Sequence, residues 1–362
     1  MAFPNGYEKF REAMIAYEDN LRAIGRAETT IENEERIFKY FSGFMLENGR
    51  WDKREESFID IQAWRDQLRR DGKKPSTIKQ YLKVLSSFYK FASSAQLGDK
   101  RWYDQNPVGS LLLPDTKKRD KRPYDELLTD EQVLLLWRNN PPQKLRRPEY
   151  WERNYAIVVL LLTTEIRNRE LLALTPSDLD WENSELIVEH GKGDKYRSVD
   201  FPLLAQTAMR IYLNSGIRPE AAGDHDPLFG TEATRDFQGA NKGAEWHAGT
   251  RQWLSNVVRR HVKSVTGVDD IRSHDLRHVG ARLDLNSGMS IEELQSKLGH
   301  ESVSTTQIYS GKLTSRKKRR MTKIVLEEKD RQAQRNIERL EVNGDNFFGQ
   351  LRLKQFQQPE TA

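Results

Sequence analysis

The feature that most constrains this chain is an unbroken apolar run, AIVVLLL, at residues 156–162. Crossing a membrane takes about 20 apolar residues, and no run in the sequence approaches that length. A segment that is apolar on every side instead predicts a buried helix, here within 153–173, covered on all faces by other elements. We therefore expect a large core around the middle of the chain and no membrane association.

A chain of 362 residues is too long for one core, so two domains and a tail are expected. The first domain, residues 1–113, is predicted to be helical. Its last helix presents Lys79 and Lys83 on a polar face, either as contacts to a DNA backbone or as ordinary solvated side chains. The second helix is expected to open with a capping box of Thr29 and Glu32. Apolar spacing predicts helices at 7–24, 29–47 and 58–70, and a fourth after KKPS at 73–76.

A charged segment with two prolines, 114–127, predicts an extended basic linker. The next domain, 128–323, is expected to begin at Thr129, which has capping-box spacing with Gln132. A charged helical tail, 324–362, completes the chain. The tail is expected either to pass to a neighbouring subunit or to lack order.

The second domain mixes short strands with helices, so the chain is predicted to be mainly α with a small β-sheet. A glycine-rich turn at 191–195 predicts a hairpin. Gly288 is expected to end one helix, and Ser290 with Glu293 to cap the next. The predicted elements are strands 186–188 and 198–201, helices 203–214 and 250–265 with a polar loop between them, and a helix, turn, helix and short helix over 275–310.

Cysteine content and charge limit the classes of function. The chain has no cysteine, which excludes disulfides and thiol catalysis and fits an intracellular, cytoplasmic protein. Net charge is only +5, yet dense basic runs lie at 117–122 and 316–320. Such runs attract phosphates through counterion release, although solvated segments have the same composition. The first residues carry no secretory signal and enter the helical domain at once.

Three segments that lie far apart in the sequence contain residue types that could form one catalytic site if the fold brings them together. Each short pattern is unspecific by itself, because any helix can contain Arg-x-x-Glu or His-x-x-Arg. Their order and spacing are specific. The candidate site residues are Arg167 and Glu170 in the first segment, Lys192 in the glycine turn, and His274, Arg277, His300 and Tyr309 in the third.

This ordered set resembles the tyrosine recombinase family. The family's second box reads His-x-x-Arg, then Leu-Gly-His, then a tyrosine nine residues after that histidine, and His300 and Tyr309 have this spacing. The first box and the lysine turn are matched at Arg167, Glu170 and Lys192. The resemblance implies an N-terminal helical core-binding domain of the SAM-like type and a C-terminal α+β catalytic domain.

Phosphodiester chemistry explains why these residue types occur together. Attack on a phosphodiester adds negative charge, and Arg167 and Arg277 offer forked donors that stay protonated. A tyrosine phenol has a pKa of about 10 in water, so Tyr309 needs a base, for which His274 is the candidate. The attack leaves a covalent intermediate that stores the bond energy for rejoining. His300 is expected to donate a hydrogen bond to a phosphate oxygen.

The resemblance also assigns supporting roles. The 5′ oxygen leaves poorly without a proton, and Lys192 matches the family's proton donor, with Lys195 as the competitor in the same turn. Glu170 is expected to hold His274 and the surrounding site. Lys195 and Arg197 join Lys79 and Lys83 as the predicted DNA contacts. No metal ligand set and no cofactor are implied.

One position departs from the family's pattern. Glu165 stands two residues before Arg167, where the family usually has glycine. A carboxylate that pointed into a phosphate clamp would repel DNA, so we expect the Glu165 side chain to point away from it. The departure affects the local geometry rather than the class of enzyme.

The predicted function is site-specific recombination of double-stranded DNA through a 3′-phosphotyrosyl intermediate and a Holliday junction. The resemblance implies a homotetramer on two DNA sites and a monomer or weak dimer when free. Integration and chromosome-dimer resolution both stay open. The alternatives are a type IB topoisomerase-like enzyme, which relaxes supercoils as a monomer, and a non-catalytic DNA-binding protein.

Overall fold

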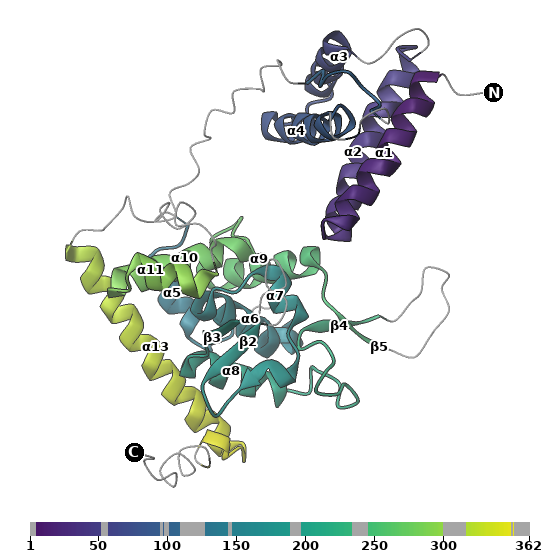
Figure 1. Cartoon of the computed structure of the whole chain (residues 1–362). Coiled ribbons are helices and arrows are strands. Elements are labelled where there is room, and N and C mark those ends of the chain that lie inside the picture. The colour runs from purple at the N-terminus through teal and green to yellow at the C-terminus, as the bar shows by residue number, and fades with distance from the viewer. Residues whose placement is uncertain are drawn as a thin grey trace, which may run out of the picture. The chain divides into compact units, whose positions relative to one another are not determined.

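The computed structural model of the protein describes residues 5–51, 57–94, 97, 101–108, 127–143, 147–188, 197–233, 245–299, 316–348 and 350. The chain divides into two compact units, Met1–Asp120 and Lys121–Ala362, both drawn in Figure 1. The division falls inside the segment 114–127 that was predicted to be a linker.

The first unit is helical, as predicted, and its core is aromatic. Phe10 lies at the centre, with its ring centroid 5.0 Å from that of Phe88 and 5.7 Å from that of Phe41. Pro75 starts the fourth helix, where a missing N–H costs nothing. The helices are α1 (Asn5–Ala23), α2 (Glu28–Glu47), α3 (Phe58–Arg70) and α4 (Pro75–Ala92).

The prediction of a capping box of Thr29 and Glu32 at the start of α2 is wrong. The N-cap is Ala27, and Glu28 is the first helical residue. Glu28 lies in the first turn, where a carboxylate interacts favourably with the helix dipole, and its side chain accepts a hydrogen bond from Arg22 Nη2 at 2.9 Å. Thr29 is therefore already inside the helix.

The second unit surrounds one buried helix, α6 (Trp151–Thr164), which contains the AIVVLLL run. Helices from several parts of the chain pack around it, and every residue from Tyr155 to Thr164 is buried. This confirms the buried helix but not its length, because α6 ends at Thr164. The other helices are α5 (Asp130–Trp137), α7 (Asn168–Ala173), α8 (Leu203–Leu213), α9 (Arg251–Thr266), α10 (Ser273–Ser287), α11 (Ile291–Leu298) and α13 (Arg316–Val342), with short 3-10 helices η3 (Pro148–Tyr150) and η4 (Pro176–Asp178).

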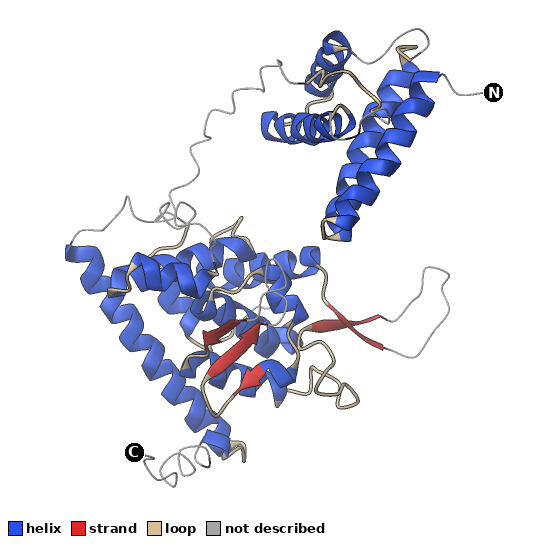
Figure 2. Ribbon diagram, in the orientation of Figure 1, coloured by secondary structure: helices blue, strands red, loops and turns tan. Residues whose placement is uncertain are grey.

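The described strands of this unit form two small antiparallel sheets, shown in red in Figure 2. The predicted pair of strands is confirmed as β2 (Glu185–Val188) and β3 (Arg197–Asp200), with Val188 opposite Arg197. Strand β1 (Leu179–Asp180), which pairs with β2, was not predicted. Strands β4 (Gly230–Ala233) and β5 (Glu245–Ala248) lie where a loop was expected.

The predicted caps of the second unit are confirmed. Thr129 accepts a hydrogen bond from the Gln132 N–H, and Ser290 accepts one from the Glu293 N–H. Gly288 ends α10 with φ at +116°, a conformation that favours glycine. These local signals position α10 and α11, which carry much of the site described below.

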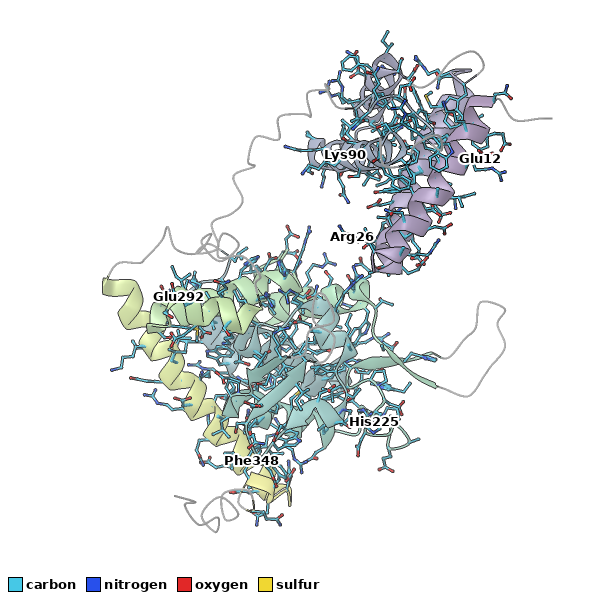
Figure 3. The ribbon with its side chains drawn as sticks, in the orientation of Figure 1. Glu12, Arg26, Lys90, His225, Glu292 and Phe348 are labelled. Carbon is cyan, nitrogen blue, oxygen red and sulfur yellow. The ribbon has the colours of Figure 1, made fainter. Side chains whose placement is uncertain are left out.

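The C-terminal helix α13 lies against the same unit. It packs on α8, α5 and α10 and extends across the predicted boundary between residues 323 and 324 (Figure 1). Phe348, labelled in Figure 3, lies just beyond its end and joins a small apolar cluster with Ile211. Within the described ranges, no helix has the length and apolar character to cross a membrane.

Candidate active site

Arg167 is placed by a break between two helices. Glu165 ends α6 with φ at +51°, and Arg167 forms the N-cap of α7. The Arg167 N–H donates to Glu170 Oε2 at 2.6 Å, and its guanidinium donates to Glu170 Oε1 at 2.9 Å. Because the arginine is fixed at both its backbone and its side chain, its guanidinium has a defined direction.

Glu170 accepts hydrogen bonds from a second arginine. Arg197, the first residue of β3, donates from both terminal nitrogens to the two carboxylate oxygens at 2.9 and 2.8 Å. Burial would raise the pKa of the Glu170 carboxyl, but hydrogen bonds from Arg197 and Arg167 lower it to about 2. Glu170 thus binds two arginines, and its expected role of holding His274 stays a prediction.

The arginines of the two boxes meet at the end of α11. Arg277, on α10, donates from Nη2 to the Leu298 carbonyl at 2.7 Å, and Arg167 donates from Nη2 to the Gly299 carbonyl at 2.7 Å. Arg277 Nη1 also donates to the Glu165 carbonyl. Carbonyls at a helix C-terminus lack helical partners and carry partial negative charge, so guanidiniums satisfy them well. Residues 110 positions apart in sequence are thereby held on adjacent carbonyls.

His274 lies in the first turn of α10, one turn before Arg277, and its side chain is exposed. Its ring centroid is 4.7 Å from that of His278, in an edge-to-face arrangement. The other predicted site residues, Lys192, Lys195, His300 and Tyr309, lie outside the described residues.

The Glu165 side chain binds a lysine that the sequence analysis missed. Glu165 Oε1 accepts a hydrogen bond from Lys297 Nζ at 2.9 Å, and Lys297 Nζ lies 2.5 Å from Asp284 Oδ2. Burial and the neighbouring Asp284 raise the pKa of the Glu165 carboxyl well above its usual range, while Lys297 opposes them. A carboxylate that closely follows a buried apolar run needs a cationic or hydrogen-bonding partner. The position of Glu165 in the sequence could therefore have indicated that such a partner exists, although not that it is Lys297.

Comparison with known proteins gives relatives over most of the chain. The model of the phage integrase family matches residues 128–316, a little over half of the sequence. The tyrosine recombinase XerC of Bacillus pumilus (strain SAFR-032) is 30% identical over 283 residues, which cover 78% of this chain and 85% of that protein. XerC of Bacillus subtilis (strain 168) is 29% identical over 285 residues, with the same two coverages.

Solved structures show the same fold. The integrase of transposon Tn1549, in complex with circular intermediate DNA, matches with a TM-score of 0.58 at 20% identity and covers 85% of this chain and 97% of that one. A lambda integrase dimer bound to a COC′ core site matches with a TM-score of 0.56 at 17% identity, covering 84% and 79%. Together with the ordered site residues and the arrangement of the arginines, these matches show that the chain belongs to the phage integrase family of tyrosine recombinases.

Proposed function

We propose that this tyrosine recombinase cleaves and rejoins duplex DNA at specific sites, with Tyr309 as the nucleophile. One observation carries the proposal. Arg167 and Arg277 are hydrogen-bonded to the carbonyls of Gly299 and Leu298, directly before His300 in the sequence. The two arginines of a phosphate clamp are therefore tied to the start of the segment that contains the histidine and the tyrosine.

The charge of the described cluster suits a phosphate that gains negative charge during attack. Arg167 and Arg197 both bind the carboxylate of Glu170, and Arg277 donates to two backbone carbonyls. Positive charge that is fixed before the reaction stabilises the transition state without reorganisation. Arg277 is only 2% exposed, and its hydrogen bonds to the Glu165 and Leu298 carbonyls fix the direction of its guanidinium.

The proposed reaction exchanges one ester for another. The Tyr309 phenolic oxygen attacks the phosphorus, the bond from phosphorus to the 5′ oxygen breaks, and a 3′-phosphotyrosyl ester forms. His274 accepts the phenol proton, Lys192 gives a proton to the departing 5′ oxygen, and His300 donates to a non-bridging oxygen. Attack by a 5′-hydroxyl from a second DNA reverses these steps, so that one round of exchange forms a Holliday junction and a second round resolves it.

The test is a nicked suicide substrate that traps the covalent adduct, run in the presence of a chelator. Wild type should form a protein–DNA adduct, and Tyr309→Phe should not. An adduct that survives this substitution would refute the assignment of the nucleophile. A two-site recombination assay beside a supercoil-relaxation assay separates recombination from topoisomerase activity, because only the former requires two sites.

Lys192 has a test of its own. Replacing the leaving 5′ oxygen with sulfur removes the need for a proton, because a thiolate is a good leaving group. Lys192→Ala should slow cleavage strongly on the oxygen substrate and weakly on the sulfur substrate, whereas Lys195→Ala should show no such difference. If sulfur fails to rescue Lys192→Ala, another residue is the general acid.

We further propose that the enzyme acts on cytoplasmic DNA as a tetramer that exchanges C-terminal tails. In the structure the tail contacts its own chain, and Arg210 Nη2 lies 3.0 Å from Asp345 Oδ2. The surface of α8 that holds Asp345 is the same on each subunit, so it would also accept the tail of a neighbour.

Charge reversal separates exchange from internal packing. Arg210→Asp and Asp345→Arg should each impair recombination, because each places like charges together. If tails are exchanged, mixing the two variants restores activity, since each tail then meets an opposite charge on the other subunit. Rescue only in the double variant of a single chain would contradict exchange.

A further inference from the structure

A buried ionic cluster connects three elements of the catalytic unit. Lys297, near the end of α11, lies 2.9 Å from Glu165 at the end of α6 and 2.5 Å from Asp284 on α10. The Lys297 side chain is 12% exposed and the Glu165 side chain is fully buried. Removing the Lys297 cation would leave Glu165 and Asp284 side by side without it, so the geometry of the cluster is constrained.

The same segments also hold the two site arginines. Glu165 uses its side chain to bind Lys297 and its carbonyl to accept a hydrogen bond from Arg277. Leu298, the residue after Lys297, offers the second carbonyl that binds Arg277. The ion pair and the arginine therefore link the same two chain segments.

We propose that Lys297 is a positioning residue for DNA cleavage. Its salt bridge to Glu165 fixes the end of α6 against the end of α11 and so sets the carbonyl pair that orients Arg277. The inference rests on the proposed role of Arg277 as a phosphate-binding residue. It assigns a function to Glu165, the position that departs from the family's usual glycine.

Gly280 supplies an independent sign that the fold is built around this carboxylate. A Cβ at Gly280 would lie 2.8 Å from Glu165 Cγ and 2.9 Å from Glu165 Oε1, closer than real side chains approach. Glu165 also has a left-handed backbone, with φ at +51°, a conformation that is unfavourable for a residue with a side chain. The missing side chain at Gly280 leaves space for the Glu165 side chain, which is retained although its backbone conformation favours glycine.

A purely structural ion pair and a positioning pair differ in what they change. Loss of a structural pair lowers stability, while the folded fraction cleaves DNA at the normal rate. Loss of a positioning pair slows cleavage at saturating DNA, with little change in DNA affinity. A small misplacement of a catalytic group costs up to about a hundredfold in rate, so the difference is measurable.

The experiment compares two variants with a matched control on the suicide substrate. Lys297→Met removes the cation. Glu165→Gly retains the carbonyl that binds Arg277 and suits the left-handed backbone, so it keeps the experiment decisive if Lys297→Met fails to fold. Asp130→Asn breaks the ion pair of Asp130 with Arg282 on α10, which has a 3.0 Å separation and side chains 9% and 11% exposed.

We expect both test variants to lower the cleavage rate at saturating DNA by at least about tenfold, with dissociation constants for DNA within about twofold of wild type. Lys297→Arg should recover part of the rate, and Asp130→Asn should cleave normally when folded. Normal cleavage by folded Glu165→Gly, or an equal loss in Asp130→Asn, would overturn the inference. Absence of any wild-type adduct would instead overturn the proposed function.

Discussion

Arg197 of β3 and Glu170 of α7 form a bidentate ion pair, in which the two nitrogen–oxygen distances are 2.9 and 2.8 Å. Arg197 was predicted as a DNA contact and Glu170 as a supporting acid. The carboxylate that binds Arg197 also binds Arg167, so both arginines belong to one cluster, and the DNA contact of Arg197 stays a prediction. Arg197, the first residue of β3, is thereby held beside Arg167 and Glu170 of the first box.

Replacing Arg197 with lysine should therefore be costly although the charge is kept. A lysine cannot form two parallel bonds to a carboxylate, and the loss of one charged hydrogen bond costs about 1.5–3 kcal/mol. We expect Arg197→Lys to lower the unfolding temperature and to slow adduct formation. Arg272→Lys is the control, since its pair with Asp270 is exposed and 3.8 Å long. Equal effects of the two substitutions would contradict the role of Arg197.

Glu170 predicts a specific pH dependence. Its pKa in the folded protein is about 2, below the ordinary 4.5, so the unfolded state binds the proton more readily. Glu170 therefore stabilises the fold fully above about pH 4.5 and progressively less as the pH falls towards 2. Chemical denaturation of wild type and Glu170→Gln should show a constant difference in unfolding free energy above pH 4.5 that narrows below it. A difference that stays constant down to pH 3 would refute this.

Gly280 should not tolerate a methyl group. An added Cβ would lie 2.4 Å from the Leu162 carbonyl oxygen and 2.8 Å from Glu165 Cγ, so α6 and α10 would have to separate. We expect Gly280→Ala to destabilise the second unit by about 1–3 kcal/mol. Gly43→Ala, in α2, is the control, because nothing lies within 4 Å of its Cβ position and alanine favours a helix. If Gly280→Ala leaves the free energy of unfolding unchanged, α6 and α10 are not packed as described.

The sequence predicted most helices because apolar spacing is a local property. It also predicted the caps at Thr129 and Ser290, which depend on residues three positions apart. The break after Thr164 was missed because no glycine or proline marks it, and Glu165 adopts the left-handed conformation instead. The short strand β4 was missed because its four residues offer too little alternation.

In the site, too, the residues of local motifs could be predicted, whereas contacts between residues far apart in the sequence could not. Arg167 and Arg277 were identified from ordered motifs, yet no sequence spacing shows that both bind the end of α11. The bond between Glu165 and Lys297 spans 132 positions, and neither residue shows locally that the other is its partner. Such contacts follow from how α6, α10 and α11 pack, which only three-dimensional structure provides.

His261 predicts sensitivity to acid. Its imidazole packs 4.6 Å from the Trp151 ring, and burial lowers its pKa to about 3. Because the unfolded chain binds the proton near pH 6.5, stability should fall as the pH decreases from 6.5 towards 3, by about 1.4 kcal/mol per pH unit from this residue. His261→Phe removes that contribution, so its unfolding free energy should fall less steeply between pH 6.5 and 5. Parallel curves for the two proteins would refute the assignment.

Lys79 and Lys83 test the predicted DNA contact of the first unit. They lie one turn apart on α4, where Lys79 is partly exposed and Lys83 is exposed. Within the described parts of the chain, no acidic side chain pairs with either lysine. Figure 3 shows the side chains along this helix, with Lys90 labelled. Each phosphate contact that is lost reduces the slope of log affinity against log salt by about 0.9.

The double variant Lys79→Ala/Lys83→Ala should therefore weaken DNA binding at low salt. It should also reduce the slope of log affinity against log salt by up to about 1.8, which is 0.9 for each lysine. Lys39→Ala provides the comparison, because Lys39 is an exposed lysine on α2 that already pairs with Glu35 at 2.6 Å. Titrations of labelled DNA at several salt concentrations give both slopes. If the double variant keeps the wild-type slope, these lysines are solvated side chains and another face of the first unit binds the DNA backbone.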